Sequence, residues 1–314
     1  MTYGAGGPGA PAYGSLFPDS VPPDSVKAPG VFVFDKDFQN PRTFSATVGY
    51  ERQIGSDLGV SISYTHARTD HLTRFFNAND TLFGVANVGP WGTGPKALGT
   101  LTVVQSSAKS RYNGITIGLK RVADPHFQFA ANYTLSFDKS DDDNERDPFT
   151  FRYAKANNLV PEYNWSDRDQ RHRFNGWALV KLPGEIYLNN RVSYYSAQPV
   201  SETCGAGNVG TGQRAGSPQD RICTDGTAPD SGRVLLRNTL RKDNAYFSWD
   251  IRISRPFPAG PRGQVEALIE IFNVTNTDNF KDPAYGGLLF NFDGTIRSGL
   301  GDPRQLQAGV RWVF

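Results

Sequence analysis

The chain ends in Arg304-Gln-Leu-Gln-Ala-Gly-Val-Arg-Trp-Val-Phe314, and this stretch decides the fold. Apolar residues recur at every second position from Leu306 to Phe314, and mostly polar or small residues fill the positions between them. Because successive side chains of a β-strand point to opposite faces, one face of this segment is apolar and the other is polar. An alternating segment of about ten residues is typical of a strand that crosses a membrane with water on its other side.

The same alternation recurs in eight segments upstream. These segments are 44–50, 58–64, 115–119, 127–137, 171–182, 186–194, 247–254 and 264–272. Two of them depart from the pattern. Asn190 interrupts the apolar face of 186–194, and in 171–182 the face that carries Phe174 opposes one that carries Trp177, so its orientation stays open.

The connections between these segments are of two kinds. Short turns rich in Gly, Pro and Asp join them pairwise at 55–57, 124–125, 183–184 and 256–263. Long connections separate the pairs at 69–109, 138–170, 198–244 and 276–303. Short turns at one rim and long loops at the other are the architecture of outer-membrane barrels, which a β-sandwich has no reason to reproduce. The sequence therefore predicts an all-β fold, an antiparallel up-and-down transmembrane β-barrel with long extracellular loops.

Composition is compatible with this fold and excludes several others. The formal net charge is +2, so nucleic acid is not an expected partner. No run of 18 apolar residues predicts a transmembrane helix, and a barrel escapes that test because half of each strand faces water. Phosphate-loop, dinucleotide and serine-hydrolase motifs are absent from the sequence, so we expect no cofactor and no enzyme activity.

The N-terminal part differs from the rest. Residues 1–42 form a Gly/Pro-rich loop or linker, in which Val31-Phe-Val-Phe34 is too short to cross a membrane, and residues 43–314 carry the strands. Nine strands leave an open edge, whereas a closed bacterial barrel has an even number of strands. The first residues lack the basic and apolar regions of a signal peptide. We therefore expect the chain to be the C-terminal partial barrel of a longer protein.

Several separate motifs resemble one known family, the TonB-dependent receptors of the Oar-like type. Ser110-Arg-Tyr-Asn-Gly-Ile-Thr-Ile-Gly-Leu-Lys-Arg121, with Phe127-Gln-Phe-Ala-Ala-Asn-Tyr-Thr-Leu-Ser136 and Asp141-Asp142, is similar to one hairpin of that family. Asp167-Arg-Asp-Gln-Arg-His-Arg-Phe174 and Tyr195-Ser-Ala-Gln-Pro199 resemble the next hairpin. Glu270-Ile-Phe-Asn-Val-Thr-Asn-Thr-Asp-Asn-Phe280 and Gly301-Asp-Pro-Arg-Gln-Leu-Gln-Ala-Gly309 resemble its C-terminal end. The resemblance extends over roughly residues 30–314.

The resemblance implies a plugged barrel of about 22 strands in the outer membrane of a Gram-negative bacterium. It implies energised uptake of a scarce ligand, an oligosaccharide or a metal chelate. The implied partners are outer-membrane lipid, the barrel-assembly machinery, the upstream strands and plug of the parent protein, and TonB through its N-terminal part. Trp312 and Phe314 then form the assembly signal at the C-terminus.

Other candidate sites lie in the expected loops. Cys204 and Cys223 are the only cysteines, and as a disulfide they would close a 20-residue ring worth about 3 kcal/mol, the alternative being two free thiols. Residues 138–147 are acidic and predict a solvated external loop, with a weak calcium site as the alternative. Aromatic residues of the loops are candidate ligand contacts: Trp91, Tyr163, Trp165 and Tyr285.

The polar strand faces carry charges that need an explanation. Glu266 and Glu270 are four positions apart, about 13 Å along a strand, which is too far for an acid/base pair of a glycosidase. In a barrel these carboxylates line the lumen, where they pair or contact a plug. Two other functions stay open: a soluble or surface-attached β-rich protein that binds carbohydrate, and a passive structural or secretion barrel.

Overall fold

The computed structural model describes residues 30–79, 99–142, 153–154, 158–202, 221–223, 233–241, 245–279 and 303–314. Within them, nine long strands form one sheet: β2 (Arg42–Ile54), β3 (Leu58–Asn77), β4 (Leu101–Arg121), β5 (Phe127–Ser140), β7 (His172–Leu182), β8 (Ile186–Tyr195), β13 (Tyr246–Pro258), β14 (Gln264–Phe272) and β15 (Gln305–Val313). No helix among these residues is long and apolar enough to cross a membrane.

The shorter elements gather at the end of the sheet where the long connections lie. They are β1 (Val31–Phe34), η3 (Val160–Glu162), β6 (Asn164–Trp165), β9 (Pro199–Val200), β10 (Ile222–Cys223), β11 (Arg233–Val234) and β12 (Leu240–Arg241), while the 3₁₀ turn η5 (Gly260–Arg262) lies in the turn between β13 and β14. Within the predicted linker, β1 pairs in parallel with the start of β4. β6 pairs with β5, and β9 with β12.

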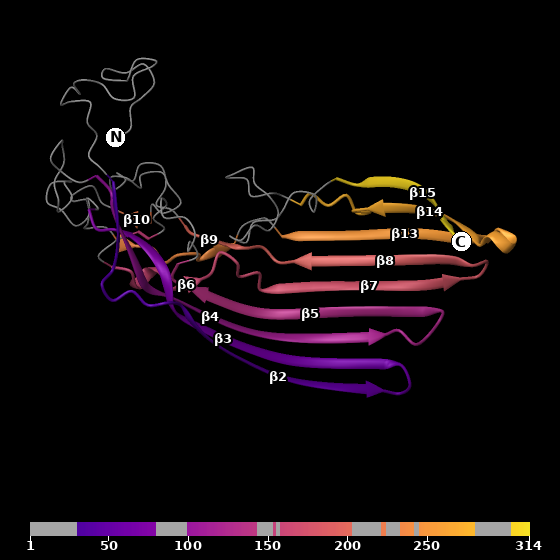
Figure 1. Ribbon diagram of the computed structural model, residues 1–314, viewed down its shortest axis with the longest axis horizontal. Helices are drawn as coiled ribbons and strands as arrows, with labels where there is room; N and C mark the ends of the chain where they lie inside the picture. The colour runs from indigo at the N-terminus through magenta and orange to yellow at the C-terminus, as the bar shows by residue number, and fades with distance from the viewer. Residues whose placement is uncertain are drawn as a thin grey trace, which may run out of the picture.

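The long strands follow one another across the sheet in chain order (Figure 1), from β2 at one edge to β15 at the other. All of these neighbours are antiparallel. The short turns β2–β3, β4–β5, β7–β8 and β13–β14 all lie at one end, on the right of Figure 1. This is the up-and-down topology that the sequence predicts, and within the described residues β2 and β15 each have one strand neighbour.

The register gives the sheet one apolar and one polar face. Directly paired residues share a face, and the row Tyr50, Ile62, Ile117, Tyr133, Phe174, Tyr194 and Phe247 crosses seven strands through such pairs. Apolar side chains on this face are exposed, with Val48 74% and Val310 75% accessible. The described strands contact chiefly their neighbours in the sheet, so the apolar face has no dry core beneath it. A soluble sandwich would bury this face, whereas a membrane wall presents it to lipid.

The strands are staggered as closure into a barrel requires. The stagger is measured from the row of paired residues to the strand end at the short turns. In β2 this distance is four residues, from Tyr50 to Ile54, and in β13 it is eleven residues, from Phe247 to Pro258. A drift of seven residues over six strands corresponds to a tilt of about 40°, given a rise of about 3.3 Å per residue and strands about 4.8 Å apart. Strands of membrane barrels tilt by about 35–45°.

The predicted loop at 69–109 needs correction. β3 and β4 run to Asn77 and from Leu101, so the predicted loop 69–109 is mostly strand where it is described. The polar residues between Ser106 and Ser110 led to the wrong boundary. Above the bilayer, a strand needs no lipid-facing apolar side, because the ladder of backbone hydrogen bonds is enough to form it.

The open question about 171–182 is resolved by pairing. Phe174 is opposite Tyr133 and Tyr194, which places it on the apolar face. Trp177 is opposite Arg191 and therefore lies on the polar face. Asn190, which interrupts the next strand, lies on the apolar face, where its side-chain oxygen accepts a hydrogen bond from the indole of Trp249 at 3.3 Å.

Candidate functional site

The polar face of the wall is lined by small and hydroxylated residues over β2–β5. Threonine side chains pair across neighbouring strands, Thr47 with Thr65 at 3.1 Å and Thr116 with Thr134 at 2.9 Å. Such cross-strand pairs stabilise a sheet by a few tenths of a kcal/mol up to about 1 kcal/mol each. A hollow of about 540 Å³ lies beside them, bordered by Glu51 and Lys120 among others. These hydroxyl groups make the face compatible with water.

A charge cluster spans the polar side of β13, β14 and β15. Glu266 lies between two arginines, with its Oε1 3.3 Å from Arg252 Nη2 and its Oε2 2.6 Å from Arg311 Nη2. The second of these is an ion pair without the geometry of a hydrogen bond. Glu270 accepts a hydrogen bond from Gln307 at 2.6 Å and lies 3.8 Å from Arg252. Cross-strand register brings these residues together, because Glu266 is paired with Arg311 and Glu270 with Arg252.

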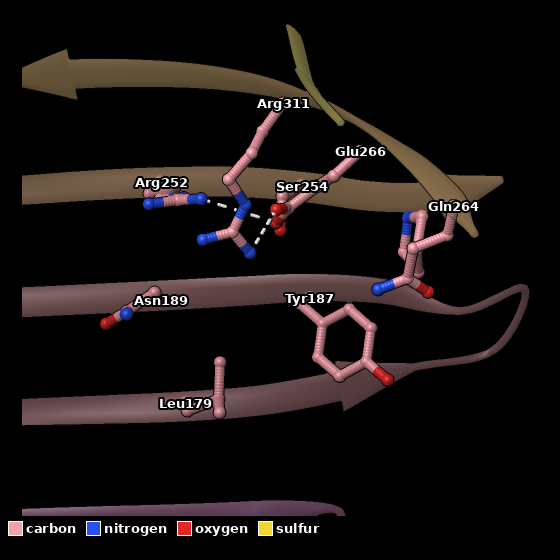
Figure 2. A pocket seen from close by; sticks show the side chains of 9 residues that line it. Leu179, Tyr187, Asn189, Arg252, Ser254, Gln264, Glu266 and Arg311 are labelled. Carbon is pink, nitrogen blue, oxygen red and sulfur yellow. Dashed lines mark hydrogen bonds and ion pairs between the residues drawn. The ribbon is translucent and has the colours of Figure 1, made fainter. Parts of the chain in front are cut away.

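The cluster borders a hollow of about 330 Å³ (Figure 2). Its lining residues are Leu179, Tyr187, Asn189, Arg252, Ser254, Pro256, Gln264, Glu266 and Arg311. Figure 2 shows Arg252 and Arg311 converging on Glu266, while Tyr187 and Asn189 project from the neighbouring strand β8. Each carboxylate has a partner, so the arrangement offers charge and hydrogen bonds to a polar surface, and not an acid/base pair for catalysis.

The short turns at the opposite end from the loops are held by their own ion pairs. Asp124 accepts hydrogen bonds from the backbone N–H groups of His126 at 2.7 Å and Phe127 at 3.2 Å. These bonds, together with Arg121 at 2.8 Å, hold the pKa of the Asp124 carboxyl below its usual range. Arg121 also pairs with Asp57 of the β2–β3 turn, and so links two neighbouring turns.

At the loop end, buried ion pairs accompany a small group of buried apolar side chains. Arg74 of β3 has 2% of its side chain exposed and lies 3.1 Å from Asp141 and 3.3 Å from Asp142. The acidic segment 138–147 is therefore not a solvated loop where it is described, and its residues 143–147 lie outside the described part. A second buried pair joins Arg221 to Glu162. Sequence reasoning missed both pairs, because the partners are far apart in the chain, and the extension of β3 that carries Arg74 was not predicted.

Two of the four candidate aromatic residues, Tyr163 and Trp165, belong to the described residues. Both contact cationic side chains of the same chain. Lys109 Nζ lies 4.8 Å from the centre of the Tyr163 ring, and Arg171 and Lys139 lie 4.3 and 4.6 Å from that of Trp165. Trp91 and Tyr285 lie outside the described residues. Of the cysteine pair, Cys223 belongs to β10 and Cys204 lies outside the described residues, so the disulfide stays a prediction.

The C-terminal residues stand at the rim of the short turns. Trp312 is 58% exposed and Phe314 fully exposed, and their rings form an edge-on contact with centroids 6.5 Å apart. Trp312 is paired with Val265 on the apolar face of the sheet. The place of these two residues fits the assembly signal that the sequence predicts, although recognition of that signal stays a prediction.

Together, the exposed apolar face, the polar face and the stagger define a wall of a membrane β-barrel. Comparison with protein families agrees: residues 3–307 match the model of the outer membrane beta barrel domain, and the chain belongs to that family. The protein is thus located in the outer membrane of a Gram-negative bacterium. No curated protein matches the chain in sequence.

Solved structures similar to the chain are outer-membrane receptors and transporters. The outer membrane transporter YddB from Escherichia coli matches 91% of this chain and 34% of its own, with 11% identity and a TM-score of 0.55. The FrpB iron transporter from Neisseria meningitidis matches 90% of this chain and 32% of its own, with 12% identity and a TM-score of 0.48. The ferric-catecholate import receptor Fiu from E. coli matches 88% and 28%, with 14% identity and a TM-score of 0.47. The chain spans about a third of the length of these structures. The likeness to YddB supports the fold alone. The resemblance to TonB-dependent receptors is therefore a resemblance of fold.

Proposed function

We propose that the chain forms the C-terminal wall of a TonB-dependent receptor that takes up a scarce ligand, an oligosaccharide or a metal chelate, across the outer membrane. The observation that carries the proposal is the asymmetry of the wall. One face is apolar and exposed over nine strands, and the other carries paired charges such as Glu266 between Arg252 and Arg311. A polar lumen behind a lipid-facing surface suits passage of a hydrophilic solute.

Further strands are needed to complete this wall. β2 and β15 each have one strand neighbour among the described residues, and lipid does not tolerate an open sheet edge. We infer that strands of the same parent protein pair with both edges.

We infer that a plug rests against the charge cluster of β13–β15. Arg252 and Arg311 keep 34% and 60% of their side chains exposed while they hold Glu266. Such partly exposed arginines can donate further hydrogen bonds to carboxylate or carbonyl oxygens of a docked domain. TonB would act through that plug. The passive barrel, the alternative within the same fold, has no plug and no energy requirement.

Uptake in cells tests the proposal. Cells with and without the gene are given a radiolabelled ferric catecholate or a radiolabelled maltodextrin, with and without a protonophore. We expect accumulation of one of the two classes only when the protein is present, and its loss with the protonophore. Uptake that persists with the protonophore would support the passive barrel instead.

Conductance of the purified protein in planar bilayers tests whether a plug closes the barrel, with matched variants on the two faces of β13. We expect a closed barrel for the native protein, a leak for Arg252→Gln on the polar face, and no leak for Arg255→Gln on the apolar face of the same strand. Steady conductance of the native protein would contradict the plug. Solubility without detergent would favour the soluble carbohydrate-binding protein.

A further inference from the structure

Three cations stand side by side on the apolar side of the wall, at its loop end. Arg68 of β3 is directly opposite Arg111 of β4, and Arg111 is directly opposite Lys139 of β5. All three share a face with Ile62 and Ile117, the apolar face of the sheet. Like charges directly opposite one another destabilise a sheet, so this row needs an anionic partner.

The chain itself supplies little of that negative charge. Asp70 holds Arg68 through its carboxylate, 2.9 Å from Arg68 Nε. Arg111, Lys139 and the neighbouring Lys109 form no ion pair among the described residues. Arg111 and Lys109 are exposed. The face therefore keeps an excess of positive charge that is open to the surroundings.

Two members of the row, Arg68 and Arg111, border a hollow of about 180 Å³, and Lys139 stands beside it, directly opposite Arg111. The lining consists of Arg68, Asp70, Lys109, Ser110, Arg111 and Tyr163. Lys109 lies over the ring of Tyr163, which forms one wall of the hollow. Three cationic side chains, two hydroxyl groups and one carboxylate, that of Asp70, surround this concave site. Asp70 offsets one of the three cations, and the others are suited to a phosphate group, whose oxygens accept bidentate bonds from arginine.

The height of the row relative to the bilayer identifies the source of the phosphate. Arg68 is ten residues from Leu58 at the β2–β3 turn, and Arg111 is ten residues from Arg121 at the β4–β5 turn. At a tilt of about 40°, ten residues rise about 25 Å along the membrane normal. The apolar band of an outer-membrane barrel is about 25 Å tall. The row thus lies at the outer edge of the band, where lipid headgroups begin.

We propose that Arg68, Lys109, Arg111 and Lys139 bind the phosphorylated headgroup of an outer-leaflet lipid. The side chains point outward from the barrel, towards lipid, and not into the lumen where a transported ligand would pass. The proposal rests on the outer-membrane placement of the chain and is independent of which solute the protein transports.

Native mass spectrometry of the detergent-purified protein tests this site. The probes are lipid A, which carries two phosphates on an acylated disaccharide, the same lipid after enzymatic removal of the phosphates, and inorganic phosphate. Each cation near such a surface contributes about 1 kcal/mol, or about fivefold in affinity. We expect lipid A to bind about 30-fold more weakly to Arg111→Gln/Lys139→Gln than to the native protein.

The control is Arg255→Gln, which removes an outward-facing arginine near the opposite rim, where Arg255 packs on Phe257. Its lipid A binding should equal that of the native protein, and all variants should keep the heat-modifiable gel migration of a folded barrel. Equal binding of lipid A to the double variant would overturn the proposal. So would equal binding of the dephosphorylated lipid, or competition by inorganic phosphate at the concentration of lipid A, which would indicate a site for free phosphate. Because solute uptake is not measured, failure here leaves the proposed transport function untouched.

Discussion

Arginine should destabilise the protein much more at one of two adjacent positions on β14 than at the other. Ile269 is 48% exposed on the apolar face, paired with Ile253 and Ala308. It is five residues from Gln264 at the turn, which at a tilt of about 40° is about 13 Å above the rim, close to the bilayer midplane. Arginine on the lipid face at the midplane costs about 2–4 kcal/mol. We expect Ile269→Arg to lower the free energy of unfolding by that amount.

Leu268 provides the matched control. Its side chain lies on the polar face over Gly309, where a lumenal arginine keeps its hydration. We expect Leu268→Arg to lower the free energy of unfolding by less than about 1 kcal/mol. The assay is equilibrium unfolding by guanidinium in phospholipid vesicles, followed by tryptophan fluorescence. Equal losses for the two variants, or the larger loss for Leu268→Arg, would refute the assignment of lipid to the apolar face.

Three further changes test other parts of the structure. Gly263 has a φ of +99° and abuts the backbone of Val313, so Gly263→Ala should cost about 1–3 kcal/mol, measured as a lower guanidinium midpoint. Arg74→Met removes the cation between the buried carboxylates of Asp141 and Asp142 and should cost about 3–5 kcal/mol, seen as faster hydrogen exchange at the loop end of β3, whereas the exposed pair lost in Arg68→Met should change exchange little. Folding lowers the pKa of the Asp124 carboxyl. The stability that this carboxylate contributes is therefore present above the usual carboxyl pKa and is lost as the pH falls through the lower pKa of the folded protein. A carbon-13 titration that shows an unshifted carboxyl pKa would contradict this.

Much of the fold follows from alternation and turn chemistry. The terminal segment from Leu306 to Phe314 shows both the strand and its faces, and Pro183-Gly184 marks a turn that the structure contains. These features are local, because the period of a strand and the backbone freedom of glycine act within a few residues. The apolar face excludes a one-residue slip but not a slip by two residues, so the pairing of Glu266 with Arg311 comes from the structure.

The loop end was not predictable in the same way. Arg74 and Asp142 are 68 positions apart, and their pairing depends on strand extensions that no apolar pattern announces. Above the membrane, the alternation that reports burial disappears, because neither face meets lipid. The row of Arg68, Arg111 and Lys139 also required the register, since none of the three lies within 25 residues of the next along the chain.

The central claim is that lipid touches one face of these strands and water the other. Spin labels on single cysteines at positions 58 to 65 of β3, in a background with Cys204→Ser and Cys223→Ser, test it directly in membranes. Even positions such as Ile62 should collide preferentially with oxygen dissolved in the bilayer, and odd positions such as Ser63 with a water-soluble nickel chelate. Loss of this period-two alternation, with all eight positions behaving alike, would contradict the account.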